Sequence, residues 1–295
     1  MHDKTLFCGI ATALVTPFRK EELDVEAFRR LVRWQAESGV HALVVAGTTG
    51  EASTLTEYER DCLLEAALTE VGGRLPIIMG TGSNDTATAL ARTRRAARLG
   101  ADGALVVTPY YNKGTKTGVR AHFLRIAEEG DLPLILYNVP SRTGVSLSLS
   151  DYEVLLPHPQ IMGAKEADGD MEKFARLCAL SAPKGRVYTG NDGLLLPSLA
   201  VGGDGCISVI SNILPKNTAD IFEFYQKKEQ AKALSLYQKM LPLSEALFKE
   251  TNPSPIKYLA ARLGYGDGSL RLPLSPVAKE TERQLISAFS PWETR

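Results

Sequence analysis

The sequence predicts a (β/α)8 barrel, or TIM barrel, of the α/β class, followed by a helical C-terminal appendage. From about residue 9 to residue 226, short apolar runs alternate with longer amphipathic runs, which is typical of strand-helix units around a parallel sheet. Eight such units in this span favour a closed barrel over an open doubly wound sheet. The first helix also lacks the Gly-x-Gly-x-x-Gly opening of a dinucleotide-binding fold.

The elements of the barrel follow from hydrophobic periodicity and from start and stop signals. A helix begins near Val25 and stops at Gly39, and Thr56 with Glu59 matches a capping box at the start of the next helix. The eight expected strands cover residues 9–15, 41–45, 75–79, 103–107, 134–137, 161–164, 187–189 and 205–209. The six later helices are expected over about 85–99, 118–129, 148–155, 171–181, 193–201 and 215–226.

The alternation ends after Tyr225, which predicts a barrel over residues 1–227 and a helical domain over 228–295. Pro242 is expected to kink or interrupt the first helix of this second part, because a proline ring removes one hydrogen bond and clashes with the preceding turn. The three helices expected here cover 230–248, 256–263 and 277–288.

Composition favours small-molecule chemistry. The 295 residues are 44% hydrophobic, and 34 basic residues balance 34 acidic ones, so no net charge argues for nucleic acid or an anionic membrane. No apolar run approaches the roughly 20 residues of a membrane span. The first seven residues lack the apolar core of a signal peptide, so we expect a cytoplasmic protein.

The cysteines and histidines are scattered, and neither set has the spacing of a metal site. Buried thiols are the simplest interpretation of the cysteines, and we expect no metal in the mechanism. The four cysteines are Cys8, Cys62, Cys178 and Cys206, and the four histidines are His2, His41, His122 and His158.

The candidate nucleophile is Lys165, at the end of the apolar run 161–164 and just before the turn 168–170. An amine at the tip of a buried parallel strand is partly desolvated, which leaves a fraction neutral and able to form a Schiff base with a ketone. The alternative is a lysine that merely ends a strand in solvent, as most lysines do.

Two further strand ends carry polar side chains that would meet at the same mouth of a barrel. Thr48 and Thr49 lie in a glycine-flanked turn whose hydroxyl and N–H groups can hold a carboxylate, although Thr and Gly also fill ordinary turns. Tyr110 and Tyr111 are adjacent in a loop and point in different directions, so they can serve a site or pack at an interface.

Tyr137 and Arg142 after the fifth strand offer a proton donor and a carboxylate clamp. Tyr137 and Lys165 are 165 − 137 = 28 residues apart, one strand-helix-strand step, so right-handed crossover places their strands side by side. We therefore expect the phenol hydroxyl to reach the lysine nitrogen.

Together these motifs resemble the class I, Schiff-base pyruvate aldolase/lyase family. The matching segments occur in order and cover nearly the whole chain. They are residues 47–51, 108–112, 137–144, 165–166, 190–192, 205–208 and 252–253.

The resemblance implies a reaction without a cofactor. Lys165 would form an imine with pyruvate, and the derived enamine would attack the aldehyde of L-aspartate 4-semialdehyde. Cyclisation would then release 4-hydroxy-tetrahydrodipicolinate, in the diaminopimelate route to lysine. A relay of hydroxyls suits these proton transfers because no strongly charged base is needed.

The resemblance also implies roles for single residues and a homo-oligomer, with a tetramer built as a dimer of dimers. Tyr111 would reach across a subunit interface into the neighbouring site. The implied catalytic residues are Lys165, Tyr137, Thr48 and Tyr111, and the implied substrate-binding residues are Thr49, Arg142, Gly190 and Ile207.

Two other functions remain open at this point. One is a pyruvate aldolase for N-acetylneuraminate or a 2-keto-3-deoxy sugar acid, although Arg142 within Ser-Arg-Thr-Gly favours the semialdehyde. The other is a non-catalytic barrel that senses a keto acid.

The resemblance also bears on regulation. Lysine-inhibited relatives bind their effector near the positions of Glu57, Arg60 and Thr88, whereas only Asn84 and Tyr110 match here. We therefore expect weak or absent feedback inhibition by lysine.

Overall fold

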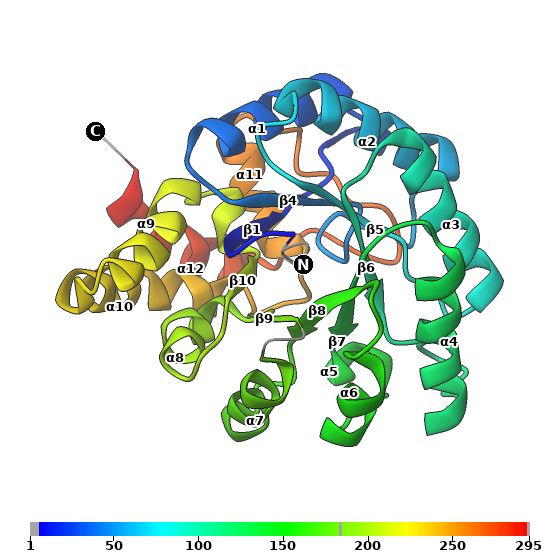
Figure 1. Cartoon of the computed structure of the whole chain (residues 1–295). Helices are drawn as coiled ribbons and strands as arrows, with labels where there is room; N and C mark the ends of the chain where they lie inside the picture. The colour runs from blue at the N-terminus through cyan, green and yellow to red at the C-terminus, as the bar shows by residue number, and fades with distance from the viewer. Residues whose placement is uncertain (1–5, 183–184, 294–295) are drawn as a thin grey trace.

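A closed barrel of eight parallel strands confirms the predicted fold class. The computed structural model describes residues 6–182 and 185–293. The strands follow one another around the barrel in the order β1-β10-β9-β8-β7-β6-β5-β4, and helices surround them (Figure 1). The strands are β1 Gly9–Ala13, β4 Ala42–Val45, β5 Ile77–Gly80, β6 Gly103–Val107, β7 Leu134–Asn138, β8 Ile161–Glu166, β9 Arg186–Thr189 and β10 Gly205–Ser208.

Strand β8 is longer than predicted and includes Lys165 and Glu166 themselves. The parallel ladder continues through the pairs Tyr137 with Lys165 and Asn138 with Glu166, so the neighbouring strand keeps these polar residues extended. The nucleophile candidate therefore lies on a rigid strand rather than on a loop.

The helices of the barrel lie close to the predicted ranges. The capping box is confirmed, since the Thr56 hydroxyl accepts from the Glu59 N–H and the Glu59 carboxylate accepts from the Thr56 N–H. The barrel helices are α1 Val25–Glu37, α2 Glu57–Val71, α3 Thr86–Leu99, α4 Lys116–Glu129, α6 Leu149–Leu155, α7 Met171–Ser181, α8 Leu195–Ala200 and α9 Pro215–Gln226.

The helix predicted over 193–201 is split into a 3-10 turn, Asp192–Leu194, and the short helix α8. Pro197 has no N–H to donate to the carbonyl of Gly193, four residues earlier. That carbonyl instead accepts a hydrogen bond from the hydroxyl of Tyr237.

Two short elements were not expected. A hairpin pairs β2 Phe18–Arg19 with β3 Glu22–Leu23, and helix α5 covers Pro140–Thr143. The hairpin turn uses Lys20 and Glu21 at φ 52° and 68°, without the glycine or asparagine that normally signals such a turn.

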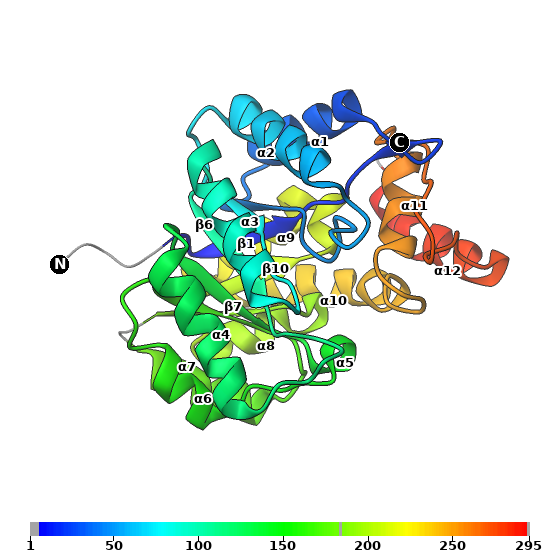
Figure 2. The same ribbon diagram turned by 90° about the vertical axis from the view of Figure 1, so that its right-hand side faces the viewer.

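The C-terminal part forms α10 Gln230–Ala246, α11 Ser254–Arg262 and α12 Lys279–Phe289. Helix α10 continues through Pro242 without interruption, and the neighbouring Met240 and Leu243 are buried. Helix α12 packs against both α10 and α11, and Figure 2 shows the three helices together on one side of the barrel. None of the helices in the described ranges is both long and apolar enough to cross a membrane.

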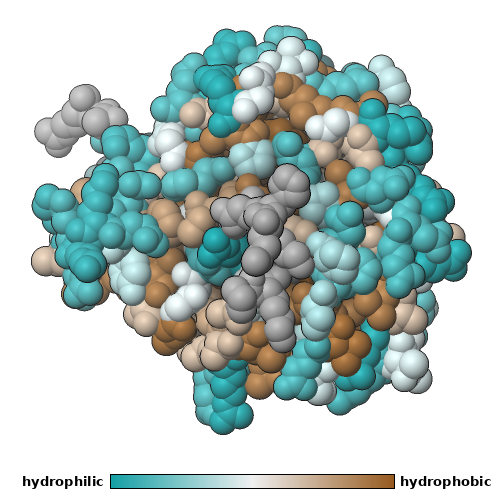
Figure 3. Space-filling view, viewed as in Figure 1, coloured by the Kyte–Doolittle hydropathy of each residue, from teal (hydrophilic) through white to brown (hydrophobic). Residues whose placement is uncertain are grey.

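Hydrophilic residues cover much of the helical periphery, with apolar patches between them (Figure 3). Inside the barrel, a separate apolar cluster includes Ile78, Ile135 and Ile207. Phe7 stacks on Tyr188 with ring centroids 4.3 Å apart, and the Tyr188 hydroxyl donates to the Phe7 carbonyl. The barrel interior is therefore packed near its N-terminal end, and the main cavity lies at the C-terminal ends of the strands.

Candidate active site

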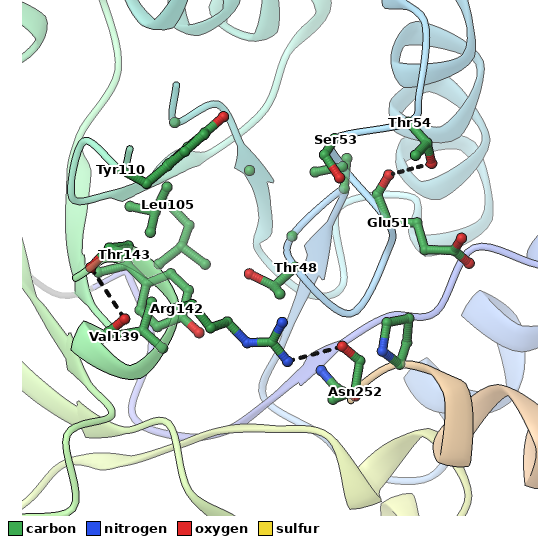
Figure 4. Close-up of a pocket in the computed structure, with 18 of the residues that line it drawn as sticks. Thr48, Glu51, Ser53, Thr54, Leu105, Tyr110, Val139, Arg142, Thr143 and Asn252 are labelled. Atoms are coloured by element: carbon green, nitrogen blue, oxygen red, sulfur yellow. Dashed lines mark hydrogen bonds between the residues drawn. The ribbon is translucent and has the colours of Figure 1, made fainter. Parts of the chain in front are cut away.

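A cavity of about 270 Å³ lies at the C-terminal ends of β4 to β7. Its wall combines loops of the barrel with two segments of the C-terminal part, as Figure 4 shows for many of its residues. The polar residues of the wall that carry the argument below are Thr48, Arg60, Arg92, Tyr110, Tyr137, Arg142 and Asn252.

Lys165 and Tyr137 lie side by side on neighbouring strands, as predicted. Tyr137 is 7% exposed and lines the cavity, while Lys165 is 5% exposed and lies behind it. The Lys165 Nζ is 4.3 Å from the centroid of the phenol ring. The contact is with the ring face, and no hydrogen bond joins the Tyr137 hydroxyl to the Lys165 nitrogen among the described residues, so the expectation that the hydroxyl reaches the nitrogen is not met in this structure. A buried amine beside a phenol is an arrangement in which Schiff-base chemistry can take place.

The loop after β9 closes around the lysine side chain. An added Cβ on Gly190 would lie 2.8 Å from the Lys165 Cε and 2.7 Å from the Ala167 Cβ, so only glycine fits there. Asp192 is buried, and its carboxylate accepts from the N–H groups of Val209 and Ile210 at 2.9 and 3.0 Å. Burial raises the pKa of Asp192, while these hydrogen bonds and the charge of Lys165 oppose the rise.

Glu166 points to the other side of β8, because side chains alternate along a strand. Its carboxylate accepts from Asn138 Nδ2 at 2.7 Å and from the Tyr152 hydroxyl at 2.9 Å, and it pairs with Lys173 Nζ at 3.0 Å. Burial raises the pKa of Glu166. These contacts fix the ends of β7 and β8, and thereby the positions of the lysine and the phenol.

The glycine-flanked turn after β4 places two hydroxyls differently. Thr48 lines the cavity and is half-buried, whereas Thr49 is 3% exposed and accepts a hydrogen bond from Asn252 Nδ2 at 3.0 Å. Ile207 is fully buried on β10 and belongs to the apolar cluster inside the barrel.

Arg142 lies on the short helix α5, and in Figure 4 its guanidinium reaches toward Thr48 and Asn252. Its Nη2 donates to the carbonyl oxygen of Asn252 at 2.9 Å. Arg142 is exposed, so a carboxylate entering the cavity can contact it.

The two adjacent tyrosines do point to different places. Tyr110 lines the cavity, whereas Tyr111 is 88% exposed with φ 70° and does not belong to the cavity wall formed by this chain. The proposed relay of Thr48, Tyr137 and Tyr111 is therefore not assembled within one copy.

The far side of the cavity is cationic. Arg60 is buried, with Nη1 donating to the Gly80 carbonyl at 3.0 Å, and burial lowers the pKa of Arg60 to about 10. Its acidic neighbour Glu57 is shared with Arg92, whose Nε lies 2.8 Å from the carboxylate. The hydroxyl of Thr88 donates a hydrogen bond to the carboxylate of the nearby Asp85.

Comparison with known proteins decides the family. Residues 6–290 match the sequence profile of the Dihydrodipicolinate synthetase family. The chain belongs to this family. A 4-hydroxy-tetrahydrodipicolinate synthase of Thermodesulfovibrio yellowstonii is 44% identical over 284 residues, covering 96% of this chain and 98% of the relative.

Solved structures agree with this membership. A monomeric variant of dihydrodipicolinate synthase superposes with a TM-score of 0.95 at 41% identity, covering 97% of both chains. The chloride-inhibited dihydrodipicolinate synthase of Acinetobacter baumannii, complexed with pyruvate, gives a TM-score of 0.94 at 40% identity, covering 97% of this chain and 98% of that one. The predicted family is confirmed, and with it the prediction that the protein is an enzyme of the lyase class.

Asp192 and Asn252 belong to the segments 190–192 and 252–253 that carry the resemblance, but neither was given a role from the sequence. Asp192 follows β9 and could have been found as a strand-end acid, the signal that identified Lys165 and Tyr137. Asn252 lies 203 residues from its partner Thr49, and no local pattern reports such a contact.

Proposed function

We propose that the protein condenses pyruvate with L-aspartate 4-semialdehyde through an imine on Lys165, as a 4-hydroxy-tetrahydrodipicolinate synthase in the diaminopimelate route to lysine. The observation that carries this assignment is the buried amine of Lys165 over the ring of Tyr137, 4.3 Å from its centroid, with Tyr137 and Arg142 both lining the cavity. The names of the relatives support the same activity.

Lys165 is the nucleophile. Its neutral amine attacks the keto carbon of pyruvate, the resulting carbinolamine loses water, and the imine loses a methyl proton to become an enamine. Tyr137 donates a proton to the leaving hydroxyl and accepts one later, a role supported by its position in the cavity wall against the Lys165 side chain. Imine formation releases one water, and conversion to the enamine releases one proton. The electron pair of the enamine then forms the new carbon-carbon bond.

The pyruvate carboxylate is held by Thr49, by the backbone around Thr48 and by the main chain of Ile207, with Gly190 lining the pocket. The steric evidence is strongest for Gly190, where a Cβ would collide with the lysine chain itself. Hydroxyl and N–H donors in a glycine-flanked turn bind a carboxylate without a full opposing charge.

Arg142 binds the carboxylate of the semialdehyde. Its guanidinium reaches into the cavity from α5, and two of its nitrogens can bind both oxygens of a carboxylate. The aldehyde then lies toward the enamine, and the substrate's own amine closes the ring and releases Lys165. This charge pair distinguishes the semialdehyde from the sugar-acid substrates of other pyruvate aldolases.

Tyr111 completes the relay with Thr48 and Tyr137 from a neighbouring subunit. An 88% exposed tyrosine held at φ 70° beside the cavity supports this role, because one copy alone leaves the ring without cover. The assembly is a homotetramer built as a dimer of dimers, and the enzyme acts in the cytoplasm without a cofactor.

Borohydride trapping tests the assignment. Wild-type protein incubated with pyruvate and borohydride should carry one reduced adduct, located by peptide mass spectrometry on Lys165, and Lys165→Ala should carry none. Lys257 serves as an internal control, since it is also buried, at 3% exposure, but is paired with Glu51. An unlabelled wild type, or a label on Lys257, would show that the protein only binds a keto acid or reacts elsewhere.

A second assay separates the substrates. Arg142→Ala should still trap pyruvate on Lys165 but should lose turnover with L-aspartate 4-semialdehyde. If the variant retained wild-type turnover with the semialdehyde, the assignment of Arg142 would be wrong.

A further inference from the structure

Asn252 contacts both of the side chains that we assign to substrate carboxylates. Its Nδ2 donates to the Thr49 Oγ1 at 3.0 Å, and its main-chain carbonyl accepts from Arg142 Nη2 at 2.9 Å. Asn252 is 5% exposed and lines the cavity from the segment between α10 and α11 (Figure 4). One residue of the C-terminal part therefore joins the turn after β4 to helix α5.

The side-chain amide of Asn252 is bonded at one end only. Its Oδ1 is buried and has no hydrogen-bond partner among the residues that the structure describes. A buried polar atom without a partner is unfavourable, and such atoms in native proteins call for an explanation. The amide is nevertheless oriented with its N–H group toward Thr49, which leaves Oδ1 without a partner among the described residues.

The direction of this hydrogen bond determines what Thr49 can do. A threonine hydroxyl has one proton to donate and lone pairs to accept. Because Asn252 donates to the Thr49 oxygen, the hydroxyl proton is not used in that contact. It remains free to bind a carboxylate oxygen.

We propose that Asn252 is a positioning residue that keeps the Thr49 hydroxyl as a donor toward the carboxylate of pyruvate. The inference rests on the proposed function, in which Thr49 binds that carboxylate. The hydrogen bond from Arg142 to the main-chain carbonyl of Asn252 also puts Asn252 at the edge of the proposed semialdehyde site. Substitution of Asn252 tests only its side chain.

The test compares Asn252→Asp with Asn252→Ala. The carboxylate of the first variant has the shape of the amide but can only accept, so it captures the Thr49 proton and removes it from pyruvate. We expect the KM for pyruvate to rise about 5-fold in Asn252→Ala, as for one lost hydrogen bond, and at least ~10-fold in Asn252→Asp. The kcat at saturating pyruvate should change less than about 3-fold in either variant, because the reacting groups are untouched. A packing role predicts the reverse order, since aspartate preserves the volume.

A Thr49→Val background separates proton capture from charge repulsion. With the hydroxyl absent, Asn252→Asp and Asn252→Ala should give the same KM for pyruvate within about 2-fold. If the aspartate variant remained worse in this background, repulsion of the substrate carboxylate would explain the effect and the proposal would be overturned.

Two controls keep the test interpretable. If Asn252→Asp does not fold, Asn252→Leu replaces it: the leucine fills the site without a donor, and a KM near the wild-type value would contradict the proposal. Borohydride trapping at saturating pyruvate should label Lys165 in every folded variant. Failure to label the wild type would refute the proposed function, whereas labelling with the wrong order of KM values would refute only the role of Asn252.

Discussion

A buried ion pair between Lys257 and Glu51 ties the C-terminal helices to the turn that carries the threonines. The Lys257 Nζ lies 2.5 Å from Glu51 Oε1, and the two side chains are 3% and 0% exposed. The ammonium also lies 3.9 Å from the centroid of the Phe18 ring, and the backbone N–H of Arg271 donates to Glu51 Oε2 at 3.1 Å. Burial lowers the pKa of Lys257, and Glu51 opposes the change.

We predict that Lys257→Met lowers the free energy of unfolding by about 3 to 5 kcal/mol, because the Glu51 carboxylate then stays buried and, among the described residues, keeps only the Arg271 N–H as a hydrogen-bond partner. Glu51→Gln should have a smaller effect, since the Phe18 ring still faces the ammonium and the neutral amide can still accept from Arg271. The double variant should be more stable than Lys257→Met alone, because neither charge is then buried without its partner.

The assay is urea unfolding followed by circular dichroism. With a slope of about 3 kcal/mol per M, the Lys257→Met midpoint should fall by about 1 to 2 M. The exposed pair of Lys279 and Glu282 provides a matched control, because Lys279 is 87% exposed and Lys279→Met should leave the midpoint unchanged. Additive effects in the double variant would refute the coupling, and a Lys257→Met midpoint equal to that of the control would refute the buried pair altogether.

Three further predictions concern catalysis, pH and regulation. Gly190→Ala should reduce imine trapping at least about 10-fold by displacing the lysine side chain, whereas Gly193→Ala, whose Cβ would meet its nearest atom at 3.7 Å, should trap normally. The hydrogen bond from Arg271 lowers the pKa of Glu59 from 4.5 to about 2, so its stabilisation is present above pH 4.5 and is lost as pH falls toward 2; urea midpoints of wild type and Glu59→Gln should converge over that range. Steady-state rates should be unchanged by millimolar L-lysine, because the buried cation of Arg60 repels an ammonium group, and micromolar inhibition would contradict this.

The barrel was predictable because the signals for each strand-helix unit lie within the sequence of that unit. Strand and helix periodicity, the capping box at Thr56 and the glycine stops set the elements within a few residues. The sequence was less informative elsewhere: α10 continues through Pro242 between buried neighbours, and the β2-β3 hairpin, which was not predicted, holds Lys20 and Glu21 at positive φ. Neither effect has a sequence signature of its own.

Part of the site was predictable for a topological reason. Parallel strands end at one mouth, so a lysine and a tyrosine one strand-helix-strand step apart were expected to meet, and they do. The register, however, determines how they meet. Direct pairing of Tyr137 with Lys165 gives a contact with the ring face, which strand spacing alone does not specify.

The remaining part of the site depends on contacts between distant segments. Asn252 reaches Thr49, Lys257 reaches Glu51, and Arg271 pairs with Glu59, so three residues of the C-terminal part bind the stretch from the turn after β4 to the first turn of α2. The strands supply the amine and the phenol, but the turn that we propose holds the pyruvate carboxylate is supported from outside the barrel. Loosening the C-terminal helices should therefore weaken pyruvate binding before it disturbs the pairing of Lys165 with Tyr137, because that pairing is maintained by the β7-β8 ladder itself.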